Sequence, residues 1–358
     1  MIGLILPAVI VINLAFWIGL FSRLIWYRPL YKPNYLHDRS LDIIVVFKNA
    51  KDSLVKLIPL LLNQKYKSLL VKAVDDYSSD GTDWSKTDFK DSPLFERSTA
   101  TEDLPGKKAA LQEAIDHSKA DIILLTDADC LPASQKWASL MAQNLGAEKK
   151  IVLGYSPVTK RKSLLNKFIR YEAWLTAVQY LSYALAGIPY MGVGRNLCYD
   201  RSLVEGFHHD LNIHSGDDDL MVSALADRQN VAICINPEAY VYTEAKSSII
   251  AYINQKARHM TTAPEYKMVH RVLLALFAGS QMMIYPVALW LLFCHLASTT
   301  SVMISLSTYI VIKMILSLML LRKLKENDLI YWVPLLDILL SAYYMIMSIR
   351  ILVPYKGW

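Results

Sequence analysis

Charged residues are almost absent from both ends of this 358-residue chain, and this constrains the fold more than any other feature. Residues 1–26 and 272–358 hold only ten of the seventy Asp, Glu, Lys and Arg residues, whereas residues 27–271 hold sixty. A helix needs roughly 20 apolar residues to cross a hydrocarbon core of about 30 Å. The ends are therefore predicted to lie in a membrane and the middle to form a water-soluble domain, which excludes a disordered chain or one soluble globule.

Four apolar stretches are long enough to span a membrane: residues 2–22, 272–296, 302–321 and 329–353. The first lacks the basic start and the cleavage site of a signal peptide, so we interpret it as a retained span. Basic residues follow the first and third spans, and the positive-inside rule places both of these ends in the cytoplasm. The sequence thus predicts a multi-pass protein of the cell (inner) membrane, with a cytoplasmic soluble domain and both termini outside.

Two ionisable residues, Lys313 and Asp337, lie inside the third and fourth spans. Each is about eight residues, or about 12 Å, from the cytoplasmic end of its own helix. If the third and fourth spans pack side by side and antiparallel, both residues therefore lie at the same depth in the membrane. We expect an ion pair that spares each charge a lone burial; a grip on a lipid headgroup is the alternative.

Composition argues against several classes of site. The four cysteines are far apart and form no CxxC pair, so neither a disulfide framework nor a zinc site is expected. His208, His209 and His214 also fit no common zinc spacing. The net charge is +6, but no long basic run occurs and the basic residues gather beside the apolar spans. Anionic lipid headgroups, and not nucleic acid, are the expected counterions.

The soluble middle alternates β-branched runs with helical patterns. Residues 41–47, 68–74 and 122–126 have the pattern of strands, and a helical pattern at residues 107–118 precedes the third of them. This alternation predicts an α/β fold with a parallel, doubly wound sheet, whose binding site lies at the carboxyl ends of the strands. Acidic clusters follow two of these strands, namely Asp75-Asp76 and Asp127-Ala128-Asp129.

The second cluster has the spacing of a metal site. Carboxylates at positions i and i+2 of a strand end project to one side, and such hard oxygen donors hold Mg²⁺ or Mn²⁺ beside a diphosphate. Because Asp127 and Asp129 follow a buried strand, and Asp75 and Asp76 end the preceding one, we interpret the cluster as a metal site and not as a solvated turn.

Two further motifs lie towards the end of the soluble region. Gln255, Arg258 and His259 share one helical face by their i, i+3 and i+4 spacing, and Arg258 can bind a phosphate through two hydrogen bonds. The alternative is an interfacial helix whose basic residues, such as Lys256, touch lipid. Three consecutive carboxylates at residues 217–219 can supply a general base, and an acidic helix N-terminus is the alternative.

In their order along the chain, the motifs at residues 75–82, 106–108, 127–129, 216–220 and 255–259 resemble those of membrane-bound family 2 glycosyltransferases. The resemblance is to the branch that includes cellulose and hyaluronan synthases and ceramide glucosyltransferase. The resemblance covers about residues 41–270. It implies a GT-A fold, a nucleotide-sugar donor with UDP favoured, a divalent metal, and inversion at the anomeric carbon. It rests on Asp75-Asp76-x-Ser-x-Asp-Gly-Thr82, Gly106-Lys107-Lys108, Asp127-x-Asp129, Gly216-Asp-Asp-Asp-Leu220 and Gln255-Lys-Ala-Arg258-His259.

The resemblance also implies roles for single residues. In the family motif the second acid is the general base, and alignment on Leu220 makes that residue Asp217. Asp218 is the alternative, because Gly216 replaces the usual Glu and leaves the register open by one. Asp129, helped by Asp127, would hold Mg²⁺ or Mn²⁺. The nucleotide sugar would be bound by Asp75, Asp76, Lys107, Lys108 and Asp127, and the catalytic set would be completed by Gln255 and Arg258.

On the acceptor side we place His259, Trp174 and Arg195, although core packing explains the aromatic region around Trp174 equally well. The family usually has Trp where His259 stands, and four spans are fewer than in polymer-secreting synthases. Both departures favour transfer of one sugar to a lipid or lipid-linked acceptor. A third departure, Ala50 in place of the usual Glu, removes one support of the nucleotide pocket.

The sequence therefore predicts a hexosyltransferase-like family 2 enzyme (EC 2.4) that contributes to a cell-envelope glycan. A processive polysaccharide synthase and a catalytically inactive scaffold that binds nucleotide sugar are the alternatives. The expected parts are an N-terminal membrane helix (1–26), a cytoplasmic GT-A domain (27–245), an interfacial amphipathic helix (246–270) and a bundle of three membrane helices (271–358).

Overall fold

The computed structural model describes residues 2–29, 38–81, 89–101, 106–207, 216 and 218–351. They belong to two compact units. The helical unit is built from Met1–Tyr27, Lys160–Ala186 and Ala245–Trp358, and the sheet unit from Arg28–Thr159 and Gly187–Glu244. The sequence predicted a single GT-A domain at residues 27–245. In the structure, Lys160–Ala186 belongs instead to the helical unit.

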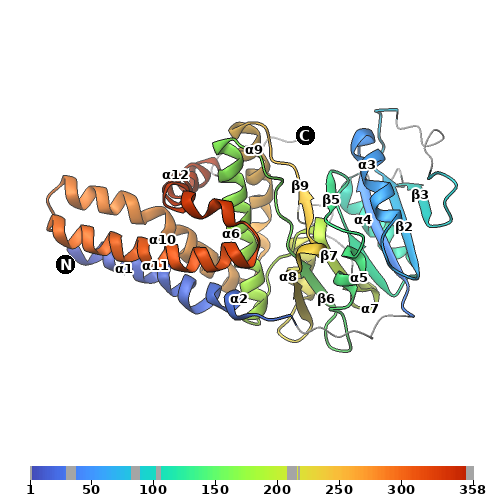
Figure 1. The fold of residues 1–358 in the computed structure, drawn as a ribbon, viewed down its shortest axis with the longest axis horizontal. Coiled ribbons are helices and arrows are strands. Elements are labelled where there is room, and N and C mark those ends of the chain that lie inside the picture. Colours follow the sequence, from blue (N-terminus) through green and yellow to red (C-terminus); the bar gives the residue numbers. More distant parts are fainter. Residues whose placement is uncertain are drawn as a thin grey trace. The chain divides into compact units, whose positions relative to one another are not determined.

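The sheet unit is built around a seven-stranded mixed sheet (Figure 1). Its strands are β1 (Leu41–Phe47), β2 (Leu69–Asp75), β3 (Phe95–Thr99), β4 (Ile122–Leu125), β6 (Ile151–Gly154), β7 (Leu197–Asp200) and β8 (Val231–Cys234). Their order is β3-β2-β1-β4-β7-β6-β8. A separate antiparallel pair is formed by β5 (Cys130–Pro132) and β9 (Val241–Thr243).

Helices cover both faces of the sheet, as the predicted doubly wound fold requires. Leucines of α3 (Lys51–Leu62) and the buried side chains of α5 (Trp137–Ala142) share one core with the odd-numbered residues of β1. The helix α4 (Lys107–Asp116) packs on β1 and β2. All seven residues of β1 are buried, which its β-branched run indicates for a central strand covered on both sides. The shorter helices of this unit are η4 (Gly194–Asn196), α7 (Arg201–Val204), α8 (Asp219–Leu225) and η5 (Pro237–Ala239).

The predicted α/β fold is confirmed, but the expectation of a fully parallel sheet is wrong for one strand. Strands β2, β1 and β4 are parallel, whereas β7 runs antiparallel to both β4 and β6. The chain reaches β7 through the 22-residue helix α6 (Leu164–Leu185), which lies in the other unit. A four-residue strand has no pattern that encodes its direction, so this reversal depends on the path of the connecting chain.

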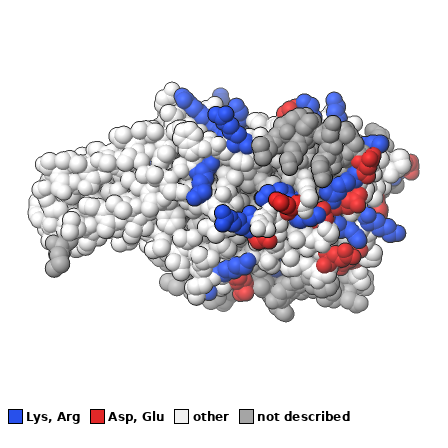
Figure 2. Space-filling view, turned by 90° about the horizontal axis from the view of Figure 1, so that it is seen from below, with Lys and Arg blue, Asp and Glu red and all other residues white. Residues whose placement is uncertain are grey.

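The helical unit contains four helices that are long and apolar enough to cross a membrane, at Ile2–Trp26, Met268–Phe293, Thr299–Lys323 and Asn327–Arg350. These agree with the four predicted spans. Among the described residues, the face shown in Figure 2 carries no charged side chains over most of the length of these helices. The elements of the unit are η1 (Ile2–Leu4), α1 (Ile5–Ala15), η2 (Phe16–Phe21, a π-helical turn), α2 (Ser22–Trp26), α6, α9 (Ile249–His259), η6 (Met260–Glu265), α10 (Met268–Phe293), α11 (Thr299–Lys323), η7 (Asn327–Trp332) and α12 (Val333–Ile351).

A buried polar network joins the membrane helices. The predicted ion pair between Lys313 of α11 and Asp337 of α12 is confirmed, and only 2% of each residue is exposed. Gln281 of α10 donates to Asp337 (3.0 Å) and accepts from Lys313 (2.6 Å). Tyr285 and Tyr309 also donate to Asp337, at 2.6 and 3.1 Å. Both charges are thus paired and hydrogen-bonded, as burial in an apolar environment requires.

The carboxylate of Asp200, at the end of β7, is a stabilising group whose effect depends on pH. Burial alone would raise its pKa, but hydrogen bonds from Ser202 and Lys150, together with the charge of Arg39, outweigh burial and lower the pKa to about 2. Lys150 and Arg39 both lie 2.9 Å from the same carboxylate oxygen. Because this folded-state pKa is below the unfolded value of about 4, the stabilisation is present above pH 4 and is lost as the pH falls towards 2.

We therefore expect Asp200→Asn to lower the free energy of unfolding by roughly 2 kcal/mol at pH 7 and to change it little at pH 2. Urea unfolding of the full chain in detergent, followed at both pH values, measures this difference. An equal loss of stability at pH 7 and pH 2 would contradict the electrostatic origin.

Candidate active site

The carboxyl end of β2 carries the acidic pair predicted to bind the nucleotide. Only 6% of Asp75 and 5% of Asp76 is exposed. Asp75 accepts a hydrogen bond from a backbone N–H of the turn that follows β2 (2.8 Å), and Asp76 accepts one from the backbone N–H of Gly106 (3.0 Å). Each carboxylate has a basic neighbour, Arg97 at 3.7 Å and Lys48 at 3.9 Å, respectively. The pair therefore ties the loops at this edge of the sheet to β2.

The Asp127–Asp129 turn follows β4 at the same edge of the sheet. Lys107, at the start of α4, lies 2.8 Å from an Asp127 carboxylate oxygen, whereas Lys108 is buried and only 8% exposed. Asp129 is exposed, and potential ligand atoms of Asp127, Asp129 and Cys130 lie within 4.8 Å of one another. Burial and the two neighbouring carboxylates raise the pKa of the Cys130 thiol well above its usual value. The two carboxylates are thus the groups suited to a hard divalent cation.

A glycine turn in η4 holds one of the candidate bases. The backbone N–H of Gly194 donates to an Asp218 carboxylate oxygen (2.5 Å), and the other oxygen caps α8 by accepting from the N–H of Asp219 (2.9 Å). A Cβ atom at position 194 would lie 3.1 Å from the Cβ atom of Asp218, so a larger residue there would require Asp218 to shift by a few tenths of an ångström. Arg195, in the same turn, donates to Ser156 (2.7 Å). Asp217, the other candidate base, lies outside the described residues.

The Gln255–Arg258–His259 face lies on the last turns of α9, in the helical unit. Gln255 and Arg258 are half-buried and His259 is exposed. Lys256, which the alternative interpretation places against lipid, has its ammonium 2.7 Å from the carboxylate of Glu172 on α6. A buried carboxylate so close is a stronger partner for the ammonium than a solvated lipid headgroup.

Trp174 lies in the core of the helical unit and is fully buried. Its ring stacks on Tyr171, with centroids 5.3 Å apart, and Trp17 of η2 packs against it at 6.3 Å. Of the two interpretations of this aromatic region, core packing describes Trp174.

The sheet unit matches a known protein family. The family model described as Glycosyl transferase family 2 matches residues 42–201, which include the strands and turns that carry Asp75, Asp76, Asp127 and Asp129. Residues 42–201 form a family 2 glycosyltransferase domain. No curated protein matches the sequence of the chain.

The fold is shared with a solved structure. The mannosyltransferase PcManGT from Pyrobaculum calidifontis, in complex with GDP-Man and Mn²⁺, is 18% identical with a TM-score of 0.62, and the match covers 97% of this chain and 99% of that one. TarS 1–349 from S. aureus also matches, at 14% identity and a TM-score of 0.44, over 88% of this chain and 93% of that one. The match to PcManGT shows that the family 2 domain has the GT-A fold, and it extends over the membrane helices.

Sequence reasoning missed two asparagines that shape the family 2 domain. Asn49, between β1 and α3, has a left-handed backbone (φ 52°) and accepts from the N–H of Ser79 (2.7 Å). It thereby holds the turn after β2. At the next position Ala50 provides no side-chain cap for α3, and Asp80 of the acidic motif accepts from the first N–H of the helix instead (3.0 Å).

The second asparagine, Asn196, is fully buried and connects four segments of the sheet unit. Its side chain accepts from the Trp137 indole (2.9 Å) and donates to the carbonyls of Tyr155 and Ala239 (2.8 and 3.0 Å). A Cβ atom at Gly154 would come within 2.4 Å of it. Asn196 therefore fixes the end of the glycine turn that holds Asp218. The only signal in the sequence is a polar residue directly before the apolar start of β7.

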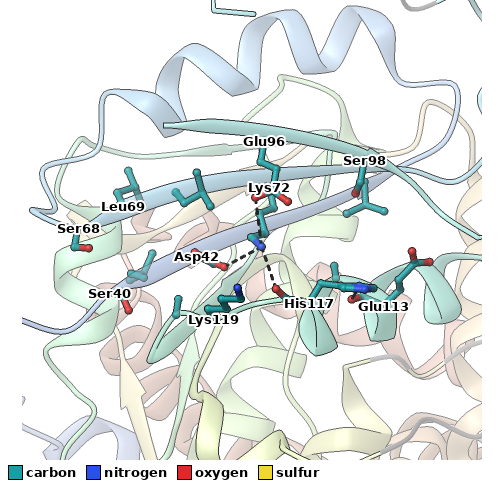
Figure 3. Close-up of a pocket in the computed structure, with 15 residues that line it drawn as sticks. Ser40, Asp42, Ser68, Leu69, Lys72, Glu96, Ser98, Glu113, His117 and Lys119 are labelled. Atoms are coloured by element: carbon teal, nitrogen blue, oxygen red, sulfur yellow. Dashed lines mark hydrogen bonds and ion pairs between the residues drawn. The ribbon is translucent and has the colours of Figure 1, made fainter. Parts of the chain in front are cut away.

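A cavity of about 780 Å³ lies away from the acidic edge (Figure 3). It lies beside the amino-terminal residues of β1 and β2, against the end of α4. Lys72 occupies its centre, 3.5 Å from Asp42, from Glu96 and from the His117 carbonyl. Burial raises the pKa of Asp42, although Ser118 and Lys72 oppose the shift. Lys72, Asp42 and Glu96 are paired with one another, so we interpret these three charges as a structural cluster of the glycosyltransferase domain.

Proposed function

We propose that this protein transfers one sugar from a nucleotide-sugar donor to a lipid or lipid-linked acceptor at the cytoplasmic face of the membrane, with inversion at the anomeric carbon. The observation that carries this proposal is the Asp127–Asp129 turn, flanked by Lys107 and by the Asp75–Asp76 edge, within a family 2 domain. The four apolar helices of the same chain support an acceptor that resides in the lipid bilayer. We further propose that both chain termini are outside.

The donor set of the turn fits Mg²⁺ or Mn²⁺. Asp129 offers an exposed carboxylate, and the Asp127 carboxylate is half-buried and has Lys107 as a charge partner. We propose that these two aspartates hold the cation, which supplies positive charge against the diphosphate of the donor. Lys107 would add a further positive charge at the same place, and Asp75 and Asp76 would shape the pocket for the nucleoside.

The acceptor hydroxyl must lose its proton as its oxygen bonds to the anomeric carbon and the bond to the nucleoside diphosphate breaks. We propose that Asp217 takes this proton. Both Asp218 oxygens already accept backbone hydrogen bonds, which suits a positioning role for Asp218. We also propose that Arg258, supported by Gln255, offsets the negative charge of the departing diphosphate, and that Arg195 and His259 serve the acceptor.

Two classes of nucleotide sugar, UDP-sugars and GDP-sugars, are candidates for the donor. The family resemblance favours UDP-sugars, whereas PcManGT was solved with GDP-Man. The test is release of nucleoside diphosphate from a panel of UDP- and GDP-sugars by detergent-purified protein, with Mg²⁺ or Mn²⁺ and with or without membrane lipid. Products with one added sugar support the proposal, and long chains would show a processive synthase. Intact donor in every reaction, with nucleotide still bound, would favour an inactive scaffold.

In the same assay we expect Asp129→Asn to lower turnover at least about 100-fold, because one of the two proposed metal ligands loses its charge. The concentration of Mn²⁺ needed for half-maximal activity should rise as well. Asp116→Asn, which neutralises an exposed carboxylate at the other end of α4, is the matched control and should leave turnover unchanged. Unchanged metal dependence in the Asp129 variant would contradict the proposed ligand.

A further inference from the structure

The helix α6 lies between β6 and β7 in the chain, yet it packs with the membrane helices. Arg170 anchors α6 to the connection between α11 and α12. This side chain is 2% exposed and binds both carboxylate oxygens of Asp328, at 2.7 and 2.8 Å, and it also pairs with Glu326. Both acids belong to the connection between α11 and α12. A buried arginine with two acidic partners makes α6 a rigid part of the helical unit.

Two residues further along α6, Glu172 faces α9. One of its carboxylate oxygens accepts a hydrogen bond from the Tyr252 hydroxyl (2.5 Å) and lies 2.7 Å from the Lys256 ammonium. Thr176 donates to the other oxygen (3.3 Å). Glu172 is 7% exposed and Tyr252 is 2% exposed, so these contacts are shielded from water. Burial and the Glu172 charge raise the pKa of Tyr252 well above its usual value, which keeps the phenol protonated as a donor.

The two partners of Glu172 are one helical turn apart on α9, an 11-residue helix. Helices of this length are marginal in isolation, so the position of α9 depends on its tertiary contacts. The rings of Phe168 and Tyr343 also pack against Tyr252, with ring centroids 6.4 and 6.0 Å from that of Tyr252, but these contacts involve no charge. The contacts of Glu172 at residues 252 and 256 fix both the rotation and the axial position of α9. They therefore also fix the positions of Gln255 and Arg258 on the same helix.

We propose that Glu172 is a positioning residue that sets the orientation of Gln255 and Arg258 through its contacts with Tyr252 and Lys256. This inference rests on the proposed role of Arg258 in transfer. It predicts that the charge pair between α6 and α9 affects kcat much more than the KM for the donor, because Arg258 acts on charge that develops as the diphosphate departs.

The test compares full-length Glu172→Gln, Lys256→Met, their double variant and the exchange Glu172→Lys with Lys256→Glu. Each single variant should lower kcat about 10-fold or more, with a less than about threefold change in donor KM. The double variant should lose no more than either single one, and the exchange should recover part of kcat. Neutralising the exposed pair Lys136–Glu238 (3.0 Å), in Lys136→Met with Glu238→Gln, is the matched control and should leave kcat unchanged.

Arg258→Ala, measured beside these variants, separates the two proposals. An inactive Arg258→Ala protein together with fully active Glu172→Gln and Lys256→Met proteins would overturn the positioning role alone. A fully active Arg258→Ala protein would instead overturn the proposed role of Arg258. Additive losses in the double variant without recovery in the exchange would also refute the positioning role, because independent structural damage gives that pattern.

Discussion

Asp217→Asn is expected to lower kcat about 1,000-fold and to leave donor binding and thermal stability unchanged. An amide cannot take the proton of the acceptor hydroxyl, and positioned general bases contribute about 10²–10⁴-fold. Asp218→Asn should act differently. Its amide oxygen can still cap α8, but its NH₂ group cannot accept from the N–H of Gly194, and a buried donor left unpaired costs about 1–3 kcal/mol.

The measurement combines nucleotide-release kinetics, donor binding by calorimetry and thermal unfolding for the two variants. We expect loss of rate at full stability for Asp217→Asn, and loss of stability with a smaller loss of rate for Asp218→Asn. The reverse pattern, an inactive and fully stable Asp218→Asn protein, would make Asp218 the base.

The membrane network should show the largest effect on stability. Lys313→Met leaves Asp337 buried without its counterion, and Asp337→Asn leaves Lys313 in the same situation. Breaking a buried ion pair from one side costs about 3–5 kcal/mol, because the remaining charge cannot reach water. We expect the cost of Lys313→Met to be at the lower end, since Gln281, Tyr285 and Tyr309 continue to donate to Asp337.

Unfolding of the detergent-solubilised protein by added SDS measures these losses. The double variant Lys313→Met with Asp337→Leu removes both charges and should regain much of the stability. Arg322→Met, at the exposed end of α11, is the control for loss of a cation and should have little effect. A charge exchange, Lys313→Asp with Asp337→Lys, that is no more stable than either of its component substitutions would argue against the ion pair.

Several parts of the fold were predictable because their signals are local. The bounds predicted for the first strand, residues 41–47, are those of β1, because a β-branched run bordered by polar residues encodes burial on both faces. The four membrane helices follow from apolar length alone. The Lys313–Asp337 pair was also predictable, since a charge in an apolar span requires a partner at the same depth.

For the candidate site, the sequence located the acidic turns but not their partners. The position of Asp75 and Asp127 at strand ends follows from strand periodicity and the topology of parallel sheets. Lys107 contacts Asp127, which is 20 positions away in the chain, and the Gly194 N–H donates to Asp218, which is 24 positions away. Nothing in the local pattern selects such partners, because any donor that the fold brings near can satisfy a carboxylate.

Local patterns in the amino-acid sequence were thus sufficient to predict which segments are buried, which lie in the membrane and which turns carry carboxylates, because hydropathy and side-chain periodicity act over a few residues. Other features emerged only in the folded chain: the direction of β7, the membership of α6 in the helical unit, the burial of Trp174 and the contact of Lys256 with Glu172. These features depend on the packing of segments that are distant in the chain. A buried tryptophan and one that faces a ligand have the same local pattern, and packing alone distinguishes them.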